Sequence, residues 1–586
     1  MQQPCIFHVL FLVWFLIGSS LSQPGQRDDL KTLLEVKKSL VTNPKEEKVL
    51  GDWNSDDPNF CKWRGVTCRG GLVVGLNLSD LGLTGSISPS IGRLINLIEL
   101  DLSSNKLEGP IPKTICSNKT SLEQLGLSGN ELSGEIPEEI SQCKSLRVLN
   151  LADNKLTGRI PESLFQLVEL TALALFNNRL QENWKFCIYT RIGFPEIGNC
   201  TNLEQIDLYR NHFSGEIPSS IGRLKELTYL HLRENQFAGN IPASLGNCNQ
   251  LTLLDLANSQ LSGSIPSSLG FLKSLQELYL YNNSLEGNLP SSLINLKNLT
   301  RLDLSRNKLN GSISPLSGSS SYLSFSVTGN RFQGDIPLDL GKSPNLDRLR
   351  LGNNRFTGRI PWTFGKIQEL SMLDISSNAL TGTIPEELGL CKKLTHVLLN
   401  NNSLSGLIPS WLGKLPLLGE LKLSSNRFTG SIPTGIFNLS STLLVLSLDG
   451  NSLNGSIPQD VGNLEALNVL NLENNQLSGS IPSEIGKLSK LYELRLSRNV
   501  LTGEIPVEIG QLQNLQVALD LSYNNLTGEI PSTISALDKL ESLDLSHNQL
   551  VGKVPGAIAH MKSLRYLNLS CNKLEGGFNK TAVDKI

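Results

Sequence analysis

The sequence predicts a solenoid, in which one short structural unit recurs along the chain and stacks on its neighbours. Two observations lead to this prediction. The pattern LxxLxLxxNxLxGxIP recurs with a period near 24 residues, and a fixed period of roughly 20–50 residues is typical of repeat architectures. The chain also has 586 residues, well above the roughly 250–300 at which a single hydrophobic core stops growing.

Each repeat contains an Asn slot, which we call position n. Asn fills this slot in 19 repeats, and Leu81 and Ser259 fill it in two more, so we expect about 21 repeats, numbered here from Leu81. This is the leucine-rich-repeat signature. The slot residues are Asn105, Asn130, Asn154, Asn178, Asn211, Asn235, Asn283, Asn307, Asn330, Asn354, Asn378, Asn402, Asn426, Asn451, Asn475, Asn499, Asn524, Asn548 and Asn572.

The alternating LxL part of each repeat predicts a short strand whose Leu side chains point inward. We expect the Asn to turn the chain and to satisfy backbone groups of neighbouring turns. One repeat cannot bury its own Leu face, so the repeats should stack about 4.8 Å apart. The predicted fold is an α/β-type leucine-rich-repeat solenoid, with short parallel strands on a concave face and loops and 3-10 or helical turns on a convex face.

The first residues are typical of a secretory signal peptide, predicted over residues 1–22. The stretch 6–17 is apolar, and Ser20 and Ser22 are small residues before a cut at Gln23. No later segment approaches the ~20 apolar residues that a membrane span needs. We therefore expect a secreted chain without a membrane span.

The remaining chain divides into a cap, a solenoid and a tail. Residues 23–71 should form an N-terminal cap, in which Asp28 and Asp29 open an amphipathic helix. Residues 72–577 should form the solenoid, with an irregular insertion at 182–194. The tail, 578–586, is expected to lack a C-terminal cap.

Twelve Asn-x-Ser/Thr sequons agree with a secretory route, because such sequons are used only there. They lie at Asn77, Asn118, Asn199, Asn282, Asn298, Asn310, Asn401, Asn438, Asn454, Asn525, Asn568 and Asn579.

Charge and motifs exclude several classes of function. The 52 basic residues balance the 54 acidic ones, which gives no reason to expect nucleic acid or an anionic membrane as partner. The sequence contains no phosphate-cradling glycine loop, no HExxH motif and no nucleophile elbow. We therefore predict a binding protein that is not an enzyme, with no cofactor and no metal site.

The candidate binding residues lie in repeats 6 to 12, at positions n−6, n−4, n−2 and n−1, which should face the concave side. Tyr and Arg are enriched there, as they are at binding hot spots. Carboxylates share this surface, so a solvated face with intramolecular ion pairs is the alternative interpretation. The candidates are Tyr209, Arg210, Tyr229, His231, Arg233, Tyr279, Tyr281, Arg301, Arg306, Arg348 and Arg350.

Arg348 and Arg350 are the most specific feature of this set. They are two residues apart on one predicted strand, so both should project from one face, roughly 6.7 Å apart at the backbone. Two guanidinium groups so placed can hold one carboxylate or sulfate. The sequon at Asn282 lies beside Tyr281, and a glycan there would crowd this surface.

The cysteines outside the cap divide into three groups. Cys143, Cys200, Cys248 and Cys391 occupy an inward position that otherwise takes Leu, so buried thiols are expected. A disulfide between Cys116 and Cys143 is the alternative for that pair. Cys187 and Cys571 are expected to be unpaired.

The cap motif WNSDDPNFCKWRGVTC resembles the paired-cysteine cap of plant leucine-rich-repeat receptor kinases, which implies a Cys61–Cys68 disulfide. The segments DLKTLLEVKKSLVTNP, SPNLDRLRLGNN and LYELRLSRNVLTGEIPVEIGQLQ are similar to the ectodomain of the GASSHO receptor kinases. The resemblance covers nearly the whole chain, although the chain has fewer repeats and no transmembrane or kinase part.

The resemblance implies a receptor ectodomain, or a secreted form of it, that perceives Tyr-sulfated peptides at the plasma membrane. It implies that Arg348 and Arg350 match an RxR motif that holds the free C-terminus of the ligand. It also implies a shorter leucine-rich-repeat co-receptor kinase docking near the last repeats, around Tyr492 to Tyr566. Two alternatives stay open: a secreted inhibitor of the polygalacturonase-inhibitor type, and a receptor fragment without function.

Overall fold

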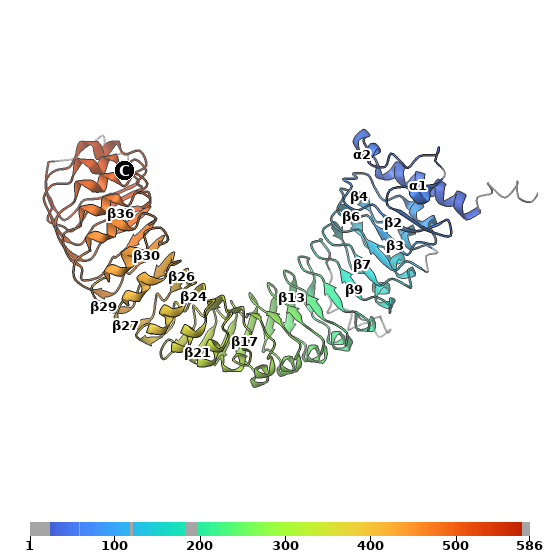
Figure 1. Ribbon diagram of the computed structural model, residues 1–586, viewed down its shortest axis with the longest axis horizontal. Helices are drawn as coiled ribbons and strands as arrows, with labels where there is room; N and C mark the ends of the chain where they lie inside the picture. Colours follow the sequence, from blue (N-terminus) through green and yellow to red (C-terminus); the bar gives the residue numbers. More distant parts are fainter. Residues whose placement is uncertain (1–23, 58, 118–120, 182–196, 577–586) are drawn as a thin grey trace, which may run out of the picture. The chain divides into compact units, whose positions relative to one another are not determined.

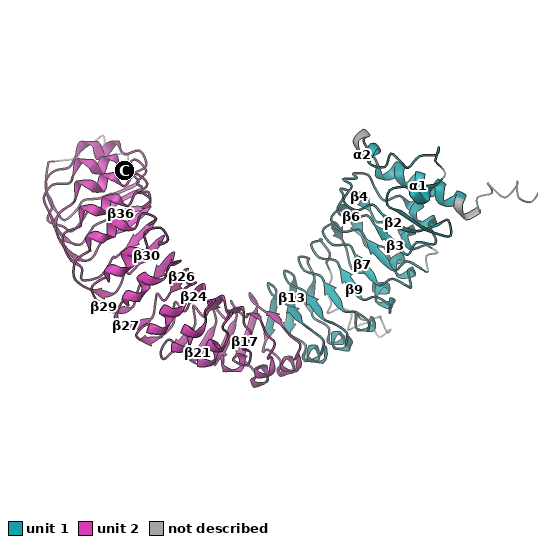
Figure 2. Cartoon of the chain, in the orientation of Figure 1, with its two compact units in different colours: residues 1–262 teal, residues 263–586 magenta. Residues whose placement is uncertain are grey.

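The computed structural model describes residues 24–57, 59–117, 121–181 and 197–576. The chain divides into two compact units, residues 1–262 and 263–586, coloured teal and magenta in Figure 2. The predicted signal peptide, the insertion 182–194 and the tail 578–586 lie outside the described residues. Among the residues described, no helix is long and apolar enough to cross a membrane.

The N-terminal cap begins with helices α1 (Pro24–Leu40) and α2 (Pro44–Val49), followed by strands β1 (Val66–Arg69) and β2 (Leu72–Asn77) (Figure 1). The prediction that Asp28 and Asp29 open the helix was wrong, because α1 starts at Pro24. Proline suits the first helical turn, where its missing N–H would have no partner in any case. Asp29 is instead buried, and its Oδ2 accepts the Val73 N–H at 3.0 Å, which ties the helix to β2.

In unit 1, one LxL strand per repeat forms a parallel ladder in register, with Leu100 opposite Leu125 and Leu149 opposite Leu173. The strands after β2 are β3 (Glu99–Asp101), β5 (Gln124–Gly126), β7 (Val148–Asn150), β9 (Ala172–Ala174), β10 (Gln205–Asp207), β12 (Tyr229–His231) and β14 (Leu253–Asp255).

Unit 2 repeats this ladder, with Leu302 opposite Phe325 and Leu349 opposite Leu373. Its strands are β16 (Glu277–Tyr279), β18 (Arg301–Asp303), β20 (Ser324–Ser326), β22 (Arg348–Arg350), β24 (Met372–Asp374), β26 (His396–Leu398), β28 (Glu420–Lys422), β30 (Val445–Ser447), β32 (Val469–Asn471), β34 (Glu493–Arg495), β36 (Ala518–Asp520), β38 (Ser542–Asp544) and β40 (Tyr566–Asn568). The predicted leucine-rich-repeat solenoid is confirmed.

A second set of short parallel strands follows the Asn of most repeats, which the sequence analysis did not predict. In unit 1 these strands are β4 (Glu108–Pro110), β6 (Glu131–Glu135), β8 (Lys155–Thr157), β11 (Ser214–Glu216), β13 (Gln236–Asn240) and β15 (Gln260–Gly263). In unit 2 they are β17 (Ser284–Asn288), β19 (Lys308–Gly311), β21 (Arg331–Asp335), β23 (Arg355–Thr357), β25 (Thr381–Gly382), β27 (Ser403–Leu407), β29 (Arg427–Gly430), β31 (Ser452–Leu453), β33 (Ser478–Gly479), β35 (Val500–Glu504), β37 (Asn525–Thr527), β39 (Val551–Lys553) and β41 (Lys573–Glu575).

The slot Asn residues tie successive repeats together. Asn105 Nδ2 donates to Leu102 O at 3.0 Å and to Leu78 O of the preceding repeat at 2.9 Å, while its Oδ1 accepts the Leu83 N–H. The same bonds recur at Asn235 and Asn426. The prediction that Asn satisfies backbone groups of neighbouring turns is therefore confirmed.

The turn itself falls on position n−1 and not on the Asn. All 21 residues at n−1 have a left-handed backbone: 18 are non-glycine residues with φ between 51° and 57°, and the others are Gly129, Gly329 and Gly450. Side chains of Asn, Asp, Ser and Gly tolerate this conformation best. A bulky residue at n−1, such as Arg306 or Tyr523, therefore stands out as an exception.

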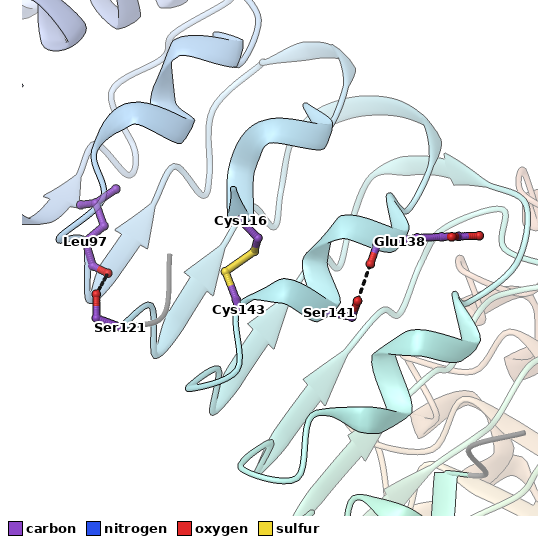
Figure 3. The surroundings of a disulfide bond; sticks show 6 residues. All are labelled: Leu97, Cys116, Ser121, Glu138, Ser141 and Cys143. Carbon is purple, nitrogen blue, oxygen red and sulfur yellow. Dashed lines mark hydrogen bonds between the residues drawn. A yellow bond between two sulfur atoms is a disulfide. The ribbon is translucent and has the colours of Figure 1, made fainter. Parts of the chain in front are cut away.

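A disulfide joins two neighbouring repeats of unit 1 (Figure 3). Cys116 ends the 3-10 helix η3 (Lys113–Cys116), and Cys143 directly follows η4 (Glu138–Gln142). The expected buried thiol at Cys143 is thus replaced by the alternative, a disulfide. Hydroxyls of Ser121 and Ser141 donate to nearby carbonyls, at 3.1 Å to Leu97 O and 2.7 Å to Glu138 O.

The other cysteines follow the sequence pattern. Cys61 and Cys68 form a disulfide in the cap. Cys200, Cys248 and Cys391 are free and buried, and Cys571 is free and exposed. Burial raises the pKa of each of the three buried thiols to about 11, so they are inert, apolar core residues. Cys187 lies outside the described residues.

Candidate functional site

The outward residues of the LxL strands and of the turn after them, positions n−6 to n−1, form what we call the strand face. Unit 1 carries Tyr209, Arg210, Tyr229, His231 and Arg233 on this face. Unit 2 carries Tyr279, Tyr281, Arg301, Arg306, Arg348 and Arg350. The two groups lie in different units.

In unit 1, His231 is clamped between two carboxylates from the neighbouring strands. Its Nδ1 lies 3.3 Å from Asp207 Oδ1 and its Nε2 lies 3.2 Å from Asp255 Oδ2. The side chains of His231, Asp207 and Asp255 are only 16%, 20% and 7% exposed. Neither ring nitrogen has good hydrogen-bond geometry, so the two contacts are best described as ion pairs.

These ion pairs determine the charge of His231. Burial alone disfavours the imidazolium, but the two aspartates outweigh it and raise the pKa of His231 to about 9. At neutral pH the ring is therefore a cation held between two anions.

We call His231 with its two partners, Asp207 and Asp255, the clamp. Aromatic rings form a column beside the clamp. Tyr209 stacks on Phe176, with ring centroids 4.8 Å apart, and on His231, with centroids 4.5 Å apart. Tyr229 meets His231 edge-on at 5.9 Å. Phe176 was missing from the predicted site, although its bulk at n−2 of repeat 5 was a visible signal.

The two arginines of unit 1 are held by one carboxylate. Glu234 contacts Arg210 Nε at 2.8 Å and Arg233 Nη2 at 2.5 Å. Burial opposes ionisation of Glu234, but the hydrogen bonds from Arg233 and Arg210 hold its pKa below the ordinary value. The alternative interpretation, a face with intramolecular ion pairs, describes this region.

Unit 2 presents its arginines differently. Arg348 and Arg350 flank the buried Leu349 on β22, so both project from the strand face as expected. Arg348 pairs with the half-exposed Asp347 at 3.2 Å, whereas Arg350 is half-buried with its Nε 3.1 Å from Met372 Sδ. Among the ion pairs of the described residues, none involves Arg350 or Arg306.

Small hydroxyl residues separate the arginines of unit 2. Ser324 lies in register between Arg301 and Arg348, and Ser326 lies between Asp303 and Arg350. Arg301 is itself held by Glu277 at 2.8 Å, and Tyr279 Oη donates to the same carboxylate at 2.8 Å. Ser324 is half-buried and Ser326 is buried, so β20 places two small polar side chains between the strands that carry the arginines.

Most of the sequon asparagines lie at the surface. Eight of the ten described sequon asparagines are exposed, and Asn310 and Asn568 are half-buried. Asn282 is exposed at n−1 beside Tyr281. Asn118 and Asn579 lie outside the described residues.

Sequence reasoning did not single out a second cluster of bulky n−1 residues in unit 2. Arg498 Cζ lies 4.6 Å from the ring centroid of Tyr523, and Tyr523 stacks on His547 at 4.0 Å. All three have a positive φ. The cluster lies within the span from Tyr492 to Tyr566 that the sequence analysis associated with a co-receptor.

Family models match most of the chain. The model described as the leucine rich repeat N-terminal domain matches residues 27–69, and that of a leucine-rich repeat region matches 187–319. Models of the leucine rich repeat match 344–404, 513–574 and seven single repeats, the first at 96–118 and the last at 490–512.

Curated relatives include two receptor-like kinases of Arabidopsis thaliana. The LRR receptor-like serine/threonine-protein kinase GSO2 is 62% identical over 123 residues, which is 21% of this chain and 10% of that protein. GSO1 is 57% identical over 103 residues, or 17% of this chain and 8% of that protein. The matches thus span about a tenth or less of the length of these relatives.

Solved structures of receptor ectodomains cover nearly the whole chain. The ectodomain of GASSHO1/SCHENGEN3 from Arabidopsis thaliana, in complex with CASPARIAN STRIP INTEGRITY FACTOR 2, is 46% identical with a TM-score of 0.68, covering 94% of this chain and 97% of that one. The Arabidopsis receptor kinase HAESA, in complex with the peptide hormone IDA and the co-receptor SERK1, is 34% identical with a TM-score of 0.84, covering 95% and 92%. The chain belongs to the leucine-rich-repeat ectodomains of plant receptor kinases, with the GASSHO receptors among its relatives.

Proposed function

We propose that this chain is an extracellular, peptide-perceiving ectodomain of a plant receptor kinase, or a secreted form of one. It binds an extended, Tyr-sulfated peptide along the strand face, the side expected from the sequence to be concave. The peptide complexes of GASSHO1 and HAESA support this class of ligand. In this role the chain recognises its ligand without catalysing a reaction.

The observation that carries the proposal is the guanidinium pair on β22. Arg350 forms no ion pair with a carboxylate among the described residues, whereas Arg348 pairs with the half-exposed Asp347, whose carboxylate also accepts a hydrogen bond from Ser371 Oγ. The small side chains of Ser324 and Ser326 on β20 lie in register beside the two arginines. Arg348 and Arg350 would hold the C-terminal carboxylate of the peptide through charge-assisted hydrogen bonds.

A second part of the proposal concerns a co-receptor. The HAESA complex contains SERK1 as co-receptor. In this chain, Arg498, Tyr523 and His547 form an exposed cation–aromatic stack near the last repeats. Arg and Tyr are typical hot-spot residues, so we propose that a shorter leucine-rich-repeat co-receptor kinase docks around Tyr492 to Tyr566.

A calorimetric titration tests the proposal. The purified chain is titrated with the CASPARIAN STRIP INTEGRITY FACTOR 2 peptide, sulfated and unsulfated. We expect tighter binding of the sulfated form and a loss of about 2–4 kcal/mol in the double variant Arg348→Ala/Arg350→Ala. The matched control, Arg355→Ala/Arg359→Ala, removes two exposed arginines from another surface of the same repeat and should bind normally. Equal affinity of both double variants and the wild type would refute the assigned role.

A further inference from the structure

The strand face of repeats 6 to 8 in unit 1 is electrically neutral. Its outward positions hold three cations and three carboxylates: Arg210, His231 and Arg233 against Asp207, Glu234 and Asp255. Each charged group has a partner, because His231 contacts both aspartates and Glu234 contacts both arginines. A ligand anion placed here would meet only cations that are already paired with carboxylates.

The clamp departs from the ordinary use of position n−4. In repeats such as those of Asp303 and Asp374, the n−4 carboxylate accepts the backbone N–H of residue n−2, at 2.8 and 3.0 Å. Asp255 keeps this bond, since its Oδ1 accepts the Ala257 N–H at 3.0 Å, whereas Asp207 Oδ1 has no hydrogen-bond partner and faces His231. The two ion pairs hold the His231 ring between β10 and β14, so they also fix where that ring lies against Tyr209.

What the clamp holds in place is an aromatic ring. His231 covers one face of Tyr209, at 4.5 Å and an interplanar angle of 19°, and Phe176 covers the other, at 4.8 Å and 13°. With both faces covered, Tyr209 can present only its edge and hydroxyl to a ligand. Aromatic pairs favour edge-to-face contacts, and a ring held in advance loses little entropy when it binds.

We propose that the column of Phe176, Tyr209 and His231 recognises an aromatic side chain of the peptide ligand, and that His231 is the positioning residue of this subsite. This inference rests on the proposed function and deepens it. It assigns aromatic recognition, rather than recognition of an acidic side chain, to the strand face of repeats 5 to 7.

Selection of peptides from a random display library tests this assignment without knowledge of the natural ligand. The targets are the full chain and its variants Tyr209→Ala, His231→Gln and Tyr523→Ala. Tyr523→Ala is the matched control, because Tyr523 also stacks on a histidine but lies in repeat 19. We expect the wild type and the control to enrich peptides with an aromatic residue at one position, and Tyr209→Ala to lose that enrichment.

Affinities of one selected peptide and of its aromatic-to-alanine analogue then separate positioning from folding. The ratio of the two affinities should be about tenfold or more for the wild type and should fall towards one in Tyr209→Ala. In His231→Gln the ratio should fall about threefold or more. Removing the charge of the whole clamp, in Asp207→Asn/His231→Gln/Asp255→Asn, should restore part of the lost ratio. A purely structural role would change the melting temperature without changing this ratio.

Two results would overturn the inference. One is an aromatic preference that is the same in Tyr209→Ala as in the wild type. The other is selection of acidic peptides whose binding depends on Arg210 and Arg233. Peptides that depend on Arg348 and Arg350 but not on Tyr209 would leave the proposed function standing and refute only this subsite. Failure of the wild type to select any peptide would count against both.

Discussion

The strand faces of unit 1 and unit 2 have the same backbone but differ in how their charged side chains are paired. Around His231, every charged side chain is matched by a partner within the protein. On β22, Arg350 lies against a methionine sulfur, and Arg348 pairs with a half-exposed aspartate. Because the inward Leu residues and the Asn bonds carry the fold, the outward positions are free to differ between the two regions. A leucine-rich repeat can thus place aromatic and anion-binding chemistry on one scaffold.

The largest expected effect is one that both regions share. Leu230 lies between Tyr229 and His231, Leu349 lies between Arg348 and Arg350, and both are fully buried. Replacing either by alanine should cost about 2–5 kcal/mol, since a cavity remains in the core. Thermal unfolding followed by circular dichroism measures this cost. A near-zero cost at either site would contradict the claim that the buried leucines stabilise both regions alike.

The pH dependence of stability should separate the regions. The folded pKa of His231, about 9, is above the ordinary 6.5. Its contribution to stability is therefore fully present below pH 6.5 and is lost as the pH rises through about 9. It amounts to at most about 3 kcal/mol.

Comparing the wild type with His231→Gln at pH 6 and pH 9.5 isolates the contribution of His231 to the free energy of unfolding. The difference in unfolding free energy between the two proteins should be larger at pH 6. A companion variant in unit 2, Arg350→Gln, should show a difference independent of pH, because arginine does not titrate in this range. A difference that is the same at both pH values for His231→Gln would contradict the clamp.

The smallest expected effect concerns the sequon at Asn282. A glycan there would crowd the surface beside Tyr281, so Asn282→Gln should strengthen peptide binding by about threefold or less. The control is Asn438→Gln, which removes an exposed sequon from the 3-10 helix η17 (Thr434–Asn438). Unchanged affinity, together with mass-spectrometric proof of a glycan on Asn282, would show that ligands avoid this strand.

The sequence predicted the repeat fold because its signals are local and occur many times. The period-two LxL pattern and the Asn slot each report one strand and one turn, and repetition removes chance matches. The prediction from sequence failed where a single contact decides the local structure. The disulfide at Cys143 depends on the neighbouring repeat placing Cys116 within reach.

The candidate site was predicted as a set of residues but not as a set of contacts. Periodicity placed Tyr209, His231 and Arg350 on the outward face. It did not show that His231 lies between two aspartates, because that contact joins residues 24 positions apart in each direction. The left-handed n−1 position is a signal that was present and unused: Arg and Tyr at such a position are uncommon and point to the cluster at Tyr523.

The central claim is that the strand face binds a peptide, and hydrogen exchange measured with and without the CASPARIAN STRIP INTEGRITY FACTOR 2 peptide tests it most directly. We predict that the peptide slows exchange in the segments 205–210, 229–234, 301–306 and 348–353. Slower exchange confined to the 3-10 helices and the second strand set, or no change at saturating peptide, would contradict the claim.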